Sequence, residues 1–477
     1  YEILRCLVGS EMCIRDRVIK RESGVTPEQA RCCKLLPSVP NRHATEYTGR
    51  HRNGSKSEDL PFKIRLRPRG SREERIVYRD CSSLDYLRPY LPETMINLVF
   101  RETGRRINYN MEKYIAPFKA DITGSFVRPE QLKEARIKFD ADELSLQELK
   151  EIEEDAIRDL VAKEKAIGLK SVSDGEFRRS SWKMDFFAGI SGLERFMETD
   201  PESGKEIERI QLSEKLHSEN HYFVQRFGML TGITGGDVVI KQTIPSPTQL
   251  YRELTRPTTI EATREIYPDE EEMIEDIIAI YRKIINDFYE SGCRYLQMDD
   301  CEWGALCDKA FENRAQCGEF GIEAEARKLA DINMAVIENK PADLVITMHI
   351  SRGSRKPNRS YEAGYEPIGK ELFSIPVDAF FLEFDNDRSG GFRSFAHVQN
   401  QKIILGLISP TDPELENKED LKNRINEATK YVPIERLGLS TRSGFASDIH
   451  DTTLTEEQQW KKLELMVEVA KEIWGEL

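Results

Sequence analysis

The feature that most constrains the fold is a regular alternation of short apolar segments and longer amphipathic segments, which runs from Met111 to the C-terminus. Most of the apolar segments show no polar–apolar alternation, as expected for strands that are covered on both faces. Strands that alternate with helices over short connections predict a parallel sheet. The apolar segments are 119–125, 170–175, 237–244, 293–299, 343–349, 377–384, 402–408 and 436–441.

Eight such units predict a closed (β/α)8 barrel of the TIM type, and the length of 111–477 leaves room for insertions. Boundary residues support the helices between the strands. Ser145 with Glu148, and Thr455 with Gln458, form capping boxes at two helix starts. The segment 187–236, between strands two and three, is expected to be a β-rich insertion. We therefore predict one catalytic barrel over 111–477.

The first 110 residues differ in composition from the rest of the chain. They hold 22 lysine and arginine residues against 14 acidic ones, and five of the nine cysteines. The opening string YEILRCLVGSEMCIRDR looks like translated sequencing-adapter sequence found in many metagenomic gene models. Acidic residues are too frequent for an organelle transit peptide. We expect 1–110 to be an artefactual or disordered leader, with Met111 as the native start.

Composition argues against several classes of protein. No run of about 18 uncharged apolar residues is present, so the sequence predicts no membrane span. The net charge of -14 argues against a general nucleic-acid-binding protein. Nine cysteines in 477 residues are too few for a disulfide-stabilised scaffold, which favours a reducing, cytoplasmic location. The expected partners are small-molecule substrates, and nothing in the sequence indicates an oligomeric state.

Polar or ionisable residues follow the apolar segments at nearly every strand end, which is where a (β/α)8 barrel places its active site. A serine or aspartate there often serves only as a helix N-cap, so each residue alone carries little weight. Together they favour an enzyme. The set comprises Ser125, Asp174 with Glu176, Ser246, Asp299 with Asp300, His349 with Ser351, Glu383, Ser409 and Ser443.

Short motifs are spread over the whole predicted barrel. They are TGSFVRP at 123–129, SDGEFRR at 173–179, IPSP at 244–247, GCRYLQMDD at 292–300, RG at 352–353, GYEP at 364–367 and SGFAS at 443–447. In this order they resemble the cobalamin-independent methionine synthase family, in particular its short stand-alone members with a single catalytic barrel. The resemblance implies transfer of a methyl group from a methylated folate to the thiol of homocysteine, without cobalamin.

The resemblance also implies roles for individual residues. The carboxylate of homocysteine is expected near Gly124 and Ser125, and its amino group near Glu176 and Asp299. With His349, Glu176 and Asp299 are then the expected catalytic residues.

In this family a zinc ion held by His, Cys, Glu and Cys binds the substrate thiol. His349 and Glu383 match the histidine and the glutamate, but Ser351 and Ser443 stand where the family has its two cysteines. A thiolate is a soft, charged ligand, whereas a serine hydroxyl stays protonated and binds zinc poorly. The sequence therefore predicts a zinc site that is weakened or lost. Cys301, after the fourth strand, is a candidate replacement ligand or an ordinary half-buried thiol.

Three functions remain open at this point. The first is a methyltransferase acting on homocysteine or a related thiol, with an altered metal site. The second is a diverged, metal-free enzyme in which His349 acts as general acid or base; the similarity of this superfamily to uroporphyrinogen decarboxylases admits lyase chemistry. The third is a non-catalytic protein that binds a ligand in the same pocket. Metal content separates the first function from the other two.

Overall fold

The computed structural model describes residues 116–475, with gaps at 200–203, 205, 308–319, 353–363, 387–388 and 449–452, and three short strands nearer the N-terminus. Contacts divide the chain into two units, Tyr1–Met111 and Glu112–Leu477. In the first unit, β1 (Glu46–Tyr47), β2 (Lys63–Arg65) and β3 (Val77–Arg79) form an antiparallel sheet. All the candidate site residues lie in the second unit.

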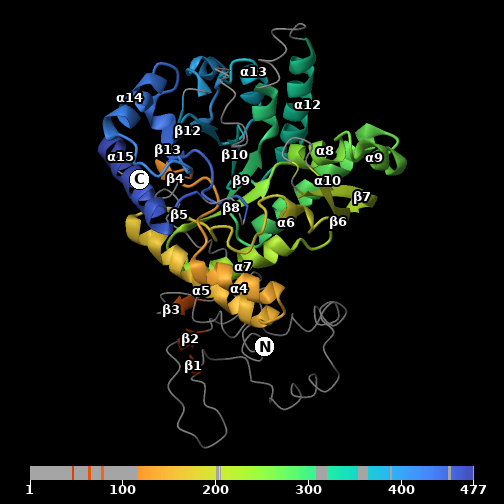
Figure 1. The fold of residues 1–477 in the computed structure, drawn as a ribbon. Coiled ribbons are helices and arrows are strands. Elements are labelled where there is room, and N and C mark those ends of the chain that lie inside the picture. Colours follow the sequence, from red (N-terminus) through yellow and green to blue (C-terminus); the bar gives the residue numbers. More distant parts are fainter. Residues whose placement is uncertain are drawn as a thin grey trace, which may run out of the picture. The chain divides into compact units, whose positions relative to one another are not determined.

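The second unit is an eight-stranded parallel barrel, which confirms the predicted fold class (Figure 1). Each of the eight predicted segments contains or overlaps one strand, and the side chains within the strands are almost all buried. Helices surround the strands. In their order around the barrel the strands are β4 (Ala120–Asp121), β13 (Leu437–Thr441), β12 (Lys402–Ile408), β11 (Ala379–Glu383), β10 (Val345–Ile350), β9 (Tyr295–Asp300), β8 (Val239–Pro245) and β5 (Ser171–Val172).

The barrel has a seam between its first two strands, because the described backbone pairings do not join β4 to β5. Buried side chains bridge this seam instead. The hydroxyl of Ser171 on β5 donates to Oδ1 of Asp121 on β4 at 2.7 Å, and the hydroxyl of Tyr295 donates to Oδ2 at 2.6 Å. The ammonium of Lys241 lies 3.4 Å from Oδ1, and neither charged side chain has any exposed surface. Asp121 therefore links β4 to β5, β8 and β9.

The helices begin where the cap residues predict. Ser145 and Thr455 both make complete capping boxes, and Asp269 caps a third helix through the backbone N–H of Glu271. The helices are α4 (Glu130–Asp140), α5 (Leu146–Ile167), α6 (Met184–Phe187), α7 (Tyr222–Thr234), α8 (Pro247–Leu254), α9 (Ile260–Ile266), α10 (Glu270–Glu290), α12 (Phe320–Ile337), α13 (Gly369–Leu372), α14 (Lys418–Ala428) and α15 (Glu456–Trp474), with short 3-10 turns at Arg393–His397 and Ile434–Arg436.

The predicted β-rich insertion is a hairpin followed by a helix. Strands β6 (Ser191–Thr199) and β7 (Glu206–His217) pair antiparallel, as expected, but α7 was not anticipated. The sequence of α7, YFVQRFGMLTGIT, is rich in aromatic and β-branched residues, which favour strands. The helix forms because His221 caps its start and because one face buries Phe223, Phe227 and Leu230 in the core.

The cap at His221 makes stability depend on pH. Its Nδ1 accepts the N–H of Phe223 at 3.2 Å, and its Nε2 lies 2.8 Å from the carbonyl of Phe186, so the ring is neutral with the proton on Nε2. Burial lowers the pKa of His221 to about 4. Between about pH 6.5 and pH 4, His221 is protonated in the unfolded chain but neutral in the folded protein. The free energy of unfolding therefore decreases as the pH falls through this range.

We predict that His221 contributes about 2 kcal/mol to the loss of unfolding free energy between pH 7 and pH 5. The matched variant is His221→Asn, which retains a cap acceptor but does not titrate in this range. Urea unfolding at both pH values measures the effect. Parallel losses in the wild type and the variant would contradict the prediction.

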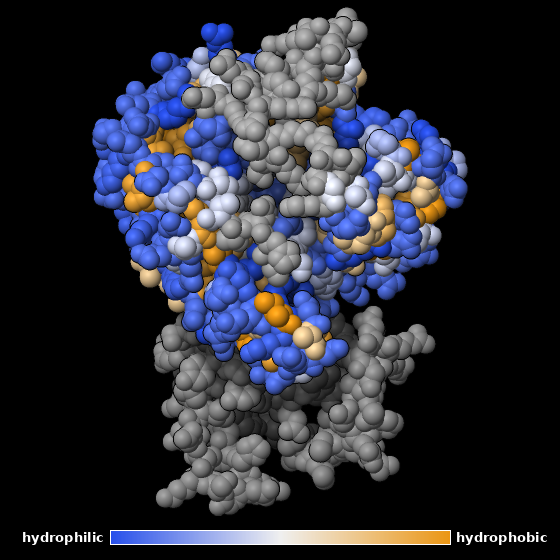
Figure 2. All heavy atoms as spheres, in the orientation of Figure 1, coloured by the Kyte–Doolittle hydropathy of each residue, from blue (hydrophilic) through white to orange (hydrophobic). Residues whose placement is uncertain are grey.

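The face of the molecule seen in Figure 2 is mostly hydrophilic, with hydrophobic residues in small separate groups. Six large hydrophobic side chains are exposed among the described residues, and they lie on several different elements rather than on one. No helix in the described part of the chain is both long and apolar enough to cross a membrane.

Candidate functional site

The predicted site residues lie at the carboxyl ends of the barrel strands. Gly124 and Ser125 follow β4, and Glu176 follows β5. Asp299 on β9 and His349 on β10 are direct partners in the parallel register, so both side chains occupy the same level of the barrel. Ser351 follows β10, Glu383 ends β11, and Ser443 follows β13.

The turn after β5 brings Glu176 to the Gly124 backbone. Gly175 and Glu176 both have positive φ angles, 62° and 59°, and the side chain of Asp174 accepts the N–H of Glu176 at 2.9 Å, which holds the turn. A Cβ added to Gly124 would lie 3.6 Å from Oε1 of Glu176. Glu176, which follows β5, therefore lies next to the backbone that follows β4.

Glu176 is a buried carboxyl group with two polar partners. The hydroxyl of Thr243 donates to its Oε1 at 2.7 Å, and Arg179 lies 3.2 Å from the same oxygen. Burial raises the pKa of Glu176, the ion pair with Arg179 opposes this, and the negative charge of Asp299 raises the pKa further. A cation bound near these two carboxyl groups would relieve this repulsion.

Ser125 is held by the loop after β13. Its hydroxyl accepts the N–H of Ala446 at 3.1 Å, and its carbonyl accepts the N–H of Phe445 at 2.7 Å. A side chain at Gly444 would overlap the Ser125 hydroxyl, so the SGFAS motif needs its glycine for this close approach. The hydroxyl of Ser125 retains a proton to donate to a ligand.

Arg128 was missed as a site residue by the sequence reasoning. Its guanidinium donates to the carbonyl oxygens of Ala446, Glu176 and Arg179 at 2.9, 3.1 and 2.7 Å. Burial lowers its pKa to about 10, so it remains a cation at neutral pH. The arginine of TGSFVRP therefore clamps the loops after β5 and β13 around the Gly124 turn.

Both ring nitrogens of His349 face acceptors. Nδ1 lies 3.1 Å from Oδ1 of Asp299, and Nε2 lies 3.0 Å from the backbone carbonyl of Arg442. Only a ring with a proton on each nitrogen satisfies both contacts, and such a ring offers no lone pair to a metal. Next to it, the hydroxyl of Ser351 donates to Oε1 of Glu383 at 3.1 Å.

These residues do not fit a zinc ion. Ser351 bonds the expected glutamate ligand, and the hydroxyl of Ser443 donates to the carbonyl of Gly444 at 3.3 Å. Burial raises the pKa of Cys301 to about 12, which disfavours a replacement thiolate. Within the described residues, no group of three or more His, Cys, Asp or Glu side chains is arranged to hold a metal ion.

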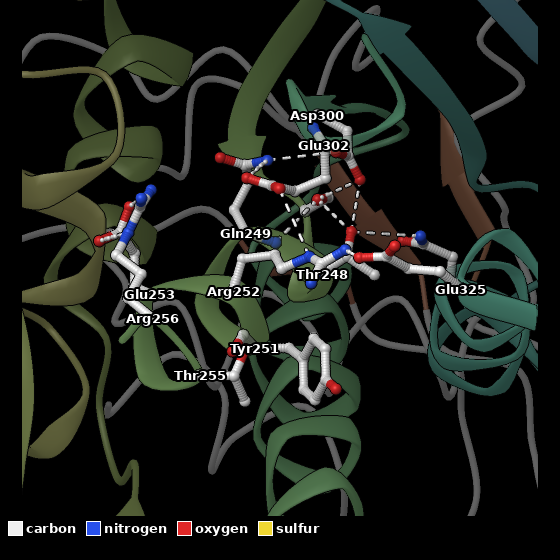
Figure 3. A network of polar contacts seen from close by, with 12 residues as sticks. Thr248, Gln249, Tyr251, Arg252, Glu253, Thr255, Arg256, Asp300, Glu302 and Glu325 are labelled. Atoms are coloured by element: carbon white, nitrogen blue, oxygen red, sulfur yellow. Dashed lines mark hydrogen bonds and ion pairs between the residues drawn. The ribbon is translucent and has the colours of Figure 1, made fainter. Parts of the chain in front are cut away.

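A polar network beside the site holds the end of β9 (Figure 3). Asp300 is fully buried and accepts hydrogen bonds from Ser246, Thr248, Gln249 and the N–H of Glu302. Ser246, which was predicted among the polar strand ends, is the N-cap of α8. The network joins α8 to the strand that carries Asp299.

The same network extends to charged residues. Arg252 lies 3.4 Å from Glu302 and also pairs with Glu325 (Figure 3). On the other side of α8, Glu253 pairs with Arg256 at 2.9 Å and with Lys183 at 2.5 Å. These pairs fix α8 against the end of β9, against α12 and against the segment that precedes α6.

Comparisons with known proteins agree with this fold. The family model described as the catalytic domain of cobalamin-independent synthase matches residues 237–472. The uncharacterized protein YxjH of Bacillus subtilis is 39% identical over 367 residues, which cover 75% of this chain and 95% of that protein. A structure from Listeria monocytogenes, assigned as a vitamin-B12-independent methionine synthase, is 36% identical, with a TM-score of 0.61, 76% of this chain covered and 100% of that one.

A second solved structure shares the fold. It is a B12-independent methionine synthase from Shewanella in complex with selenomethionine, 19% identical, with a TM-score of 0.57, and the match covers 74% of this chain and 97% of that one. The barrel, the motifs at its strand ends and these relatives lead to one conclusion: the chain belongs to the cobalamin-independent methionine synthase family.

Proposed function

We propose that this protein is a methyltransferase that transfers a methyl group to the thiol of homocysteine or of a closely related α-amino acid. The observation that carries the proposal is that Glu176 lies beside Gly124, while Asp299 is joined to the carbonyl of Thr123, next to the turn, through the side chain of Gln297. Two carboxyl groups suit an ammonium group, and the turn with the Ser125 hydroxyl suits a carboxylate. The site therefore matches both charged groups of an amino acid.

The expected methyl donor is a methylated folate, in line with the family. In the reaction the substrate sulfur attacks the methyl carbon, the nitrogen–methyl bond breaks, and the folate nitrogen takes up a proton. Only a thiolate attacks well, so the thiol must lose its proton first. His349, which contacts Asp299 and the carbonyl of Arg442, is the side chain that we expect to favour the thiolate.

The same histidine supports a second candidate, a metal-free enzyme with different chemistry or a protein that only binds its ligand. In the described site His349 and Ser351 are engaged by Asp299, Arg442 and Glu383 rather than directed towards a common metal position. The reaction assay separates these candidates, because only the first forms a methylated thiol.

The test is methyl transfer by the full chain from a methylated folate to homocysteine, with methionine measured by mass spectrometry. We expect turnover in the wild type and a loss of roughly 10- to 100-fold in kcat/KM for Glu176→Gln, since a charged hydrogen bond to the ammonium disappears. Calorimetry with homocysteine and with methionine reports binding independently. Binding without turnover would favour the ligand-binding candidate, and neither binding nor turnover would refute the proposal.

A further inference from the structure

Gln297 lies under the candidate site and was not among the predicted site residues. It is on β9, it is fully buried, and its side chain lies between Thr123 and Asp299. Its Nε2 donates to the carbonyl oxygen of Thr123 at 2.6 Å and to Oδ1 of Asp299 at 2.7 Å. Because a carbonyl and a carboxylate both accept, the amide nitrogen must face them, and this fixes the orientation of the amide.

The other half of the amide has no partner. Oε1 of Gln297 is buried and accepts no hydrogen bond from any described residue. A buried acceptor left without a donor costs about 1–3 kcal/mol, so an isolated structural role accounts for this glutamine poorly. The orphaned oxygen belongs to the same amide that contacts Asp299, one of the two carboxyl groups expected to hold the substrate ammonium.

The two partners of Gln297 belong to opposite ends of the proposed amino-acid site. Thr123 immediately precedes the Gly124–Ser125 turn and is anchored to β13, where its hydroxyl donates to the carbonyl of Thr441 at 2.6 Å. Asp299 contacts His349. One amide group therefore sets the spacing between the turn that would bind the carboxylate and the carboxyl group that would bind the ammonium.

We propose that Gln297 is a positioning residue that makes the site select α-amino acids over thiols without an amino group. An α-amino acid carries its carboxylate and ammonium on one carbon, so it engages both ends only if their spacing is held within a few tenths of an ångström. A thiol that lacks the amino group uses only the turn and is insensitive to this spacing. The inference rests on the proposed function.

The test compares homocysteine with 4-mercaptobutanoate, the same chain without the amino group, by calorimetry on the full protein. Wild type is expected to prefer homocysteine by roughly 100-fold, because the analogue leaves the site carboxyl groups unpaired. Gln297→Met, which keeps the length but has no donor, should reduce this preference about 10-fold, mostly through weaker homocysteine binding. The control is Gln242→Met, which removes a buried amide from the neighbouring strand β8 and should leave the preference unchanged.

A second variant, Gln297→Glu, keeps the inference testable if Gln297→Met does not fold. It keeps the side-chain volume but can donate at most one hydrogen bond, in its protonated form, so it cannot make both bonds of the amide and should reduce the preference as well. Equal weakening of both ligands in the Gln297 variants, or an unchanged preference, would overturn the inference while leaving the proposed function intact. A wild type that binds neither ligand would instead refute the proposed function, and this inference with it.

Discussion

With Ser351 and Ser443 both replaced by cysteine, the protein is expected to bind about one zinc ion per chain, against less than about 0.1 for the wild type. Contacts in the site join these positions in pairs. Ser351 contacts Glu383 at 3.1 Å, and Nε2 of His349 contacts the carbonyl of Arg442, the residue before Ser443. Two thiolates would supply the soft, charged ligands that the hydroxyl groups lack.

Zinc would also reorganise His349. The metal would take Nε2 in place of the Arg442 carbonyl, and binding would release a proton from the ring. The hydrogen bond from Nδ1 to Asp299 would remain. The carboxylate would then orient the histidine that binds the metal. The two cysteine substitutions should therefore be sufficient for zinc binding, without a change at any other residue of the site.

Elemental mass spectrometry on protein purified without chelator measures this effect. The matched control is Ser351→Cys combined with Ser409→Cys, which moves the second thiol from the loop after β13 to the loop after β12. That protein has the same number of added thiols but should retain little zinc. A double variant without zinc would show that the four positions do not converge on one metal. A wild type with one zinc per chain would show that the site binds zinc with serine at positions 351 and 443.

The fold was largely predictable from sequence because its signals are local. Apolar segments bounded by caps such as Ser145 and Thr455 mark where strands and helices begin, and eight repeats of this pattern permit few architectures. The prediction failed for α7, where local preference favoured a strand. That helix depends on burial against distant parts of the core, which a short window of sequence does not reveal.

The site was predictable as a list of residues but not as a set of contacts. Family motifs pointed to His349 and Ser125, but the partner of His349 Nε2 is a backbone carbonyl, which leaves no signature in side-chain types. Arg128 and Gln297 stood within recognised motifs, yet their roles depend on contacts between residues as much as 318 and 174 positions apart. Their place within those motifs was the only available signal.

Asp121→Ala is expected to lower the free energy of unfolding by about 3–5 kcal/mol, because it breaks a buried ion pair by removing one partner. The ammonium of Lys241 would stay in the barrel interior without its counter-charge, and burial already lowers its pKa. The hydroxyl groups of Ser171 and Tyr295 would lose their acceptor at the same time. Urea unfolding at pH 7, followed by circular dichroism, measures the loss.

Two further variants identify its cause. Asp121→Asn keeps an acceptor for the hydroxyl groups and should be less damaging than Asp121→Ala. Combining Asp121→Leu with Lys241→Met removes both charges, and a well-packed apolar pair should recover part of the stability. If this double variant is as unstable as Asp121→Ala, the packing of the seam rather than its charge holds β4 against β5. If Asp121→Ala costs less than about 1 kcal/mol, the seam between β4 and β5, the strands that precede Gly124 and Glu176, is held by other contacts, such as those of Arg128.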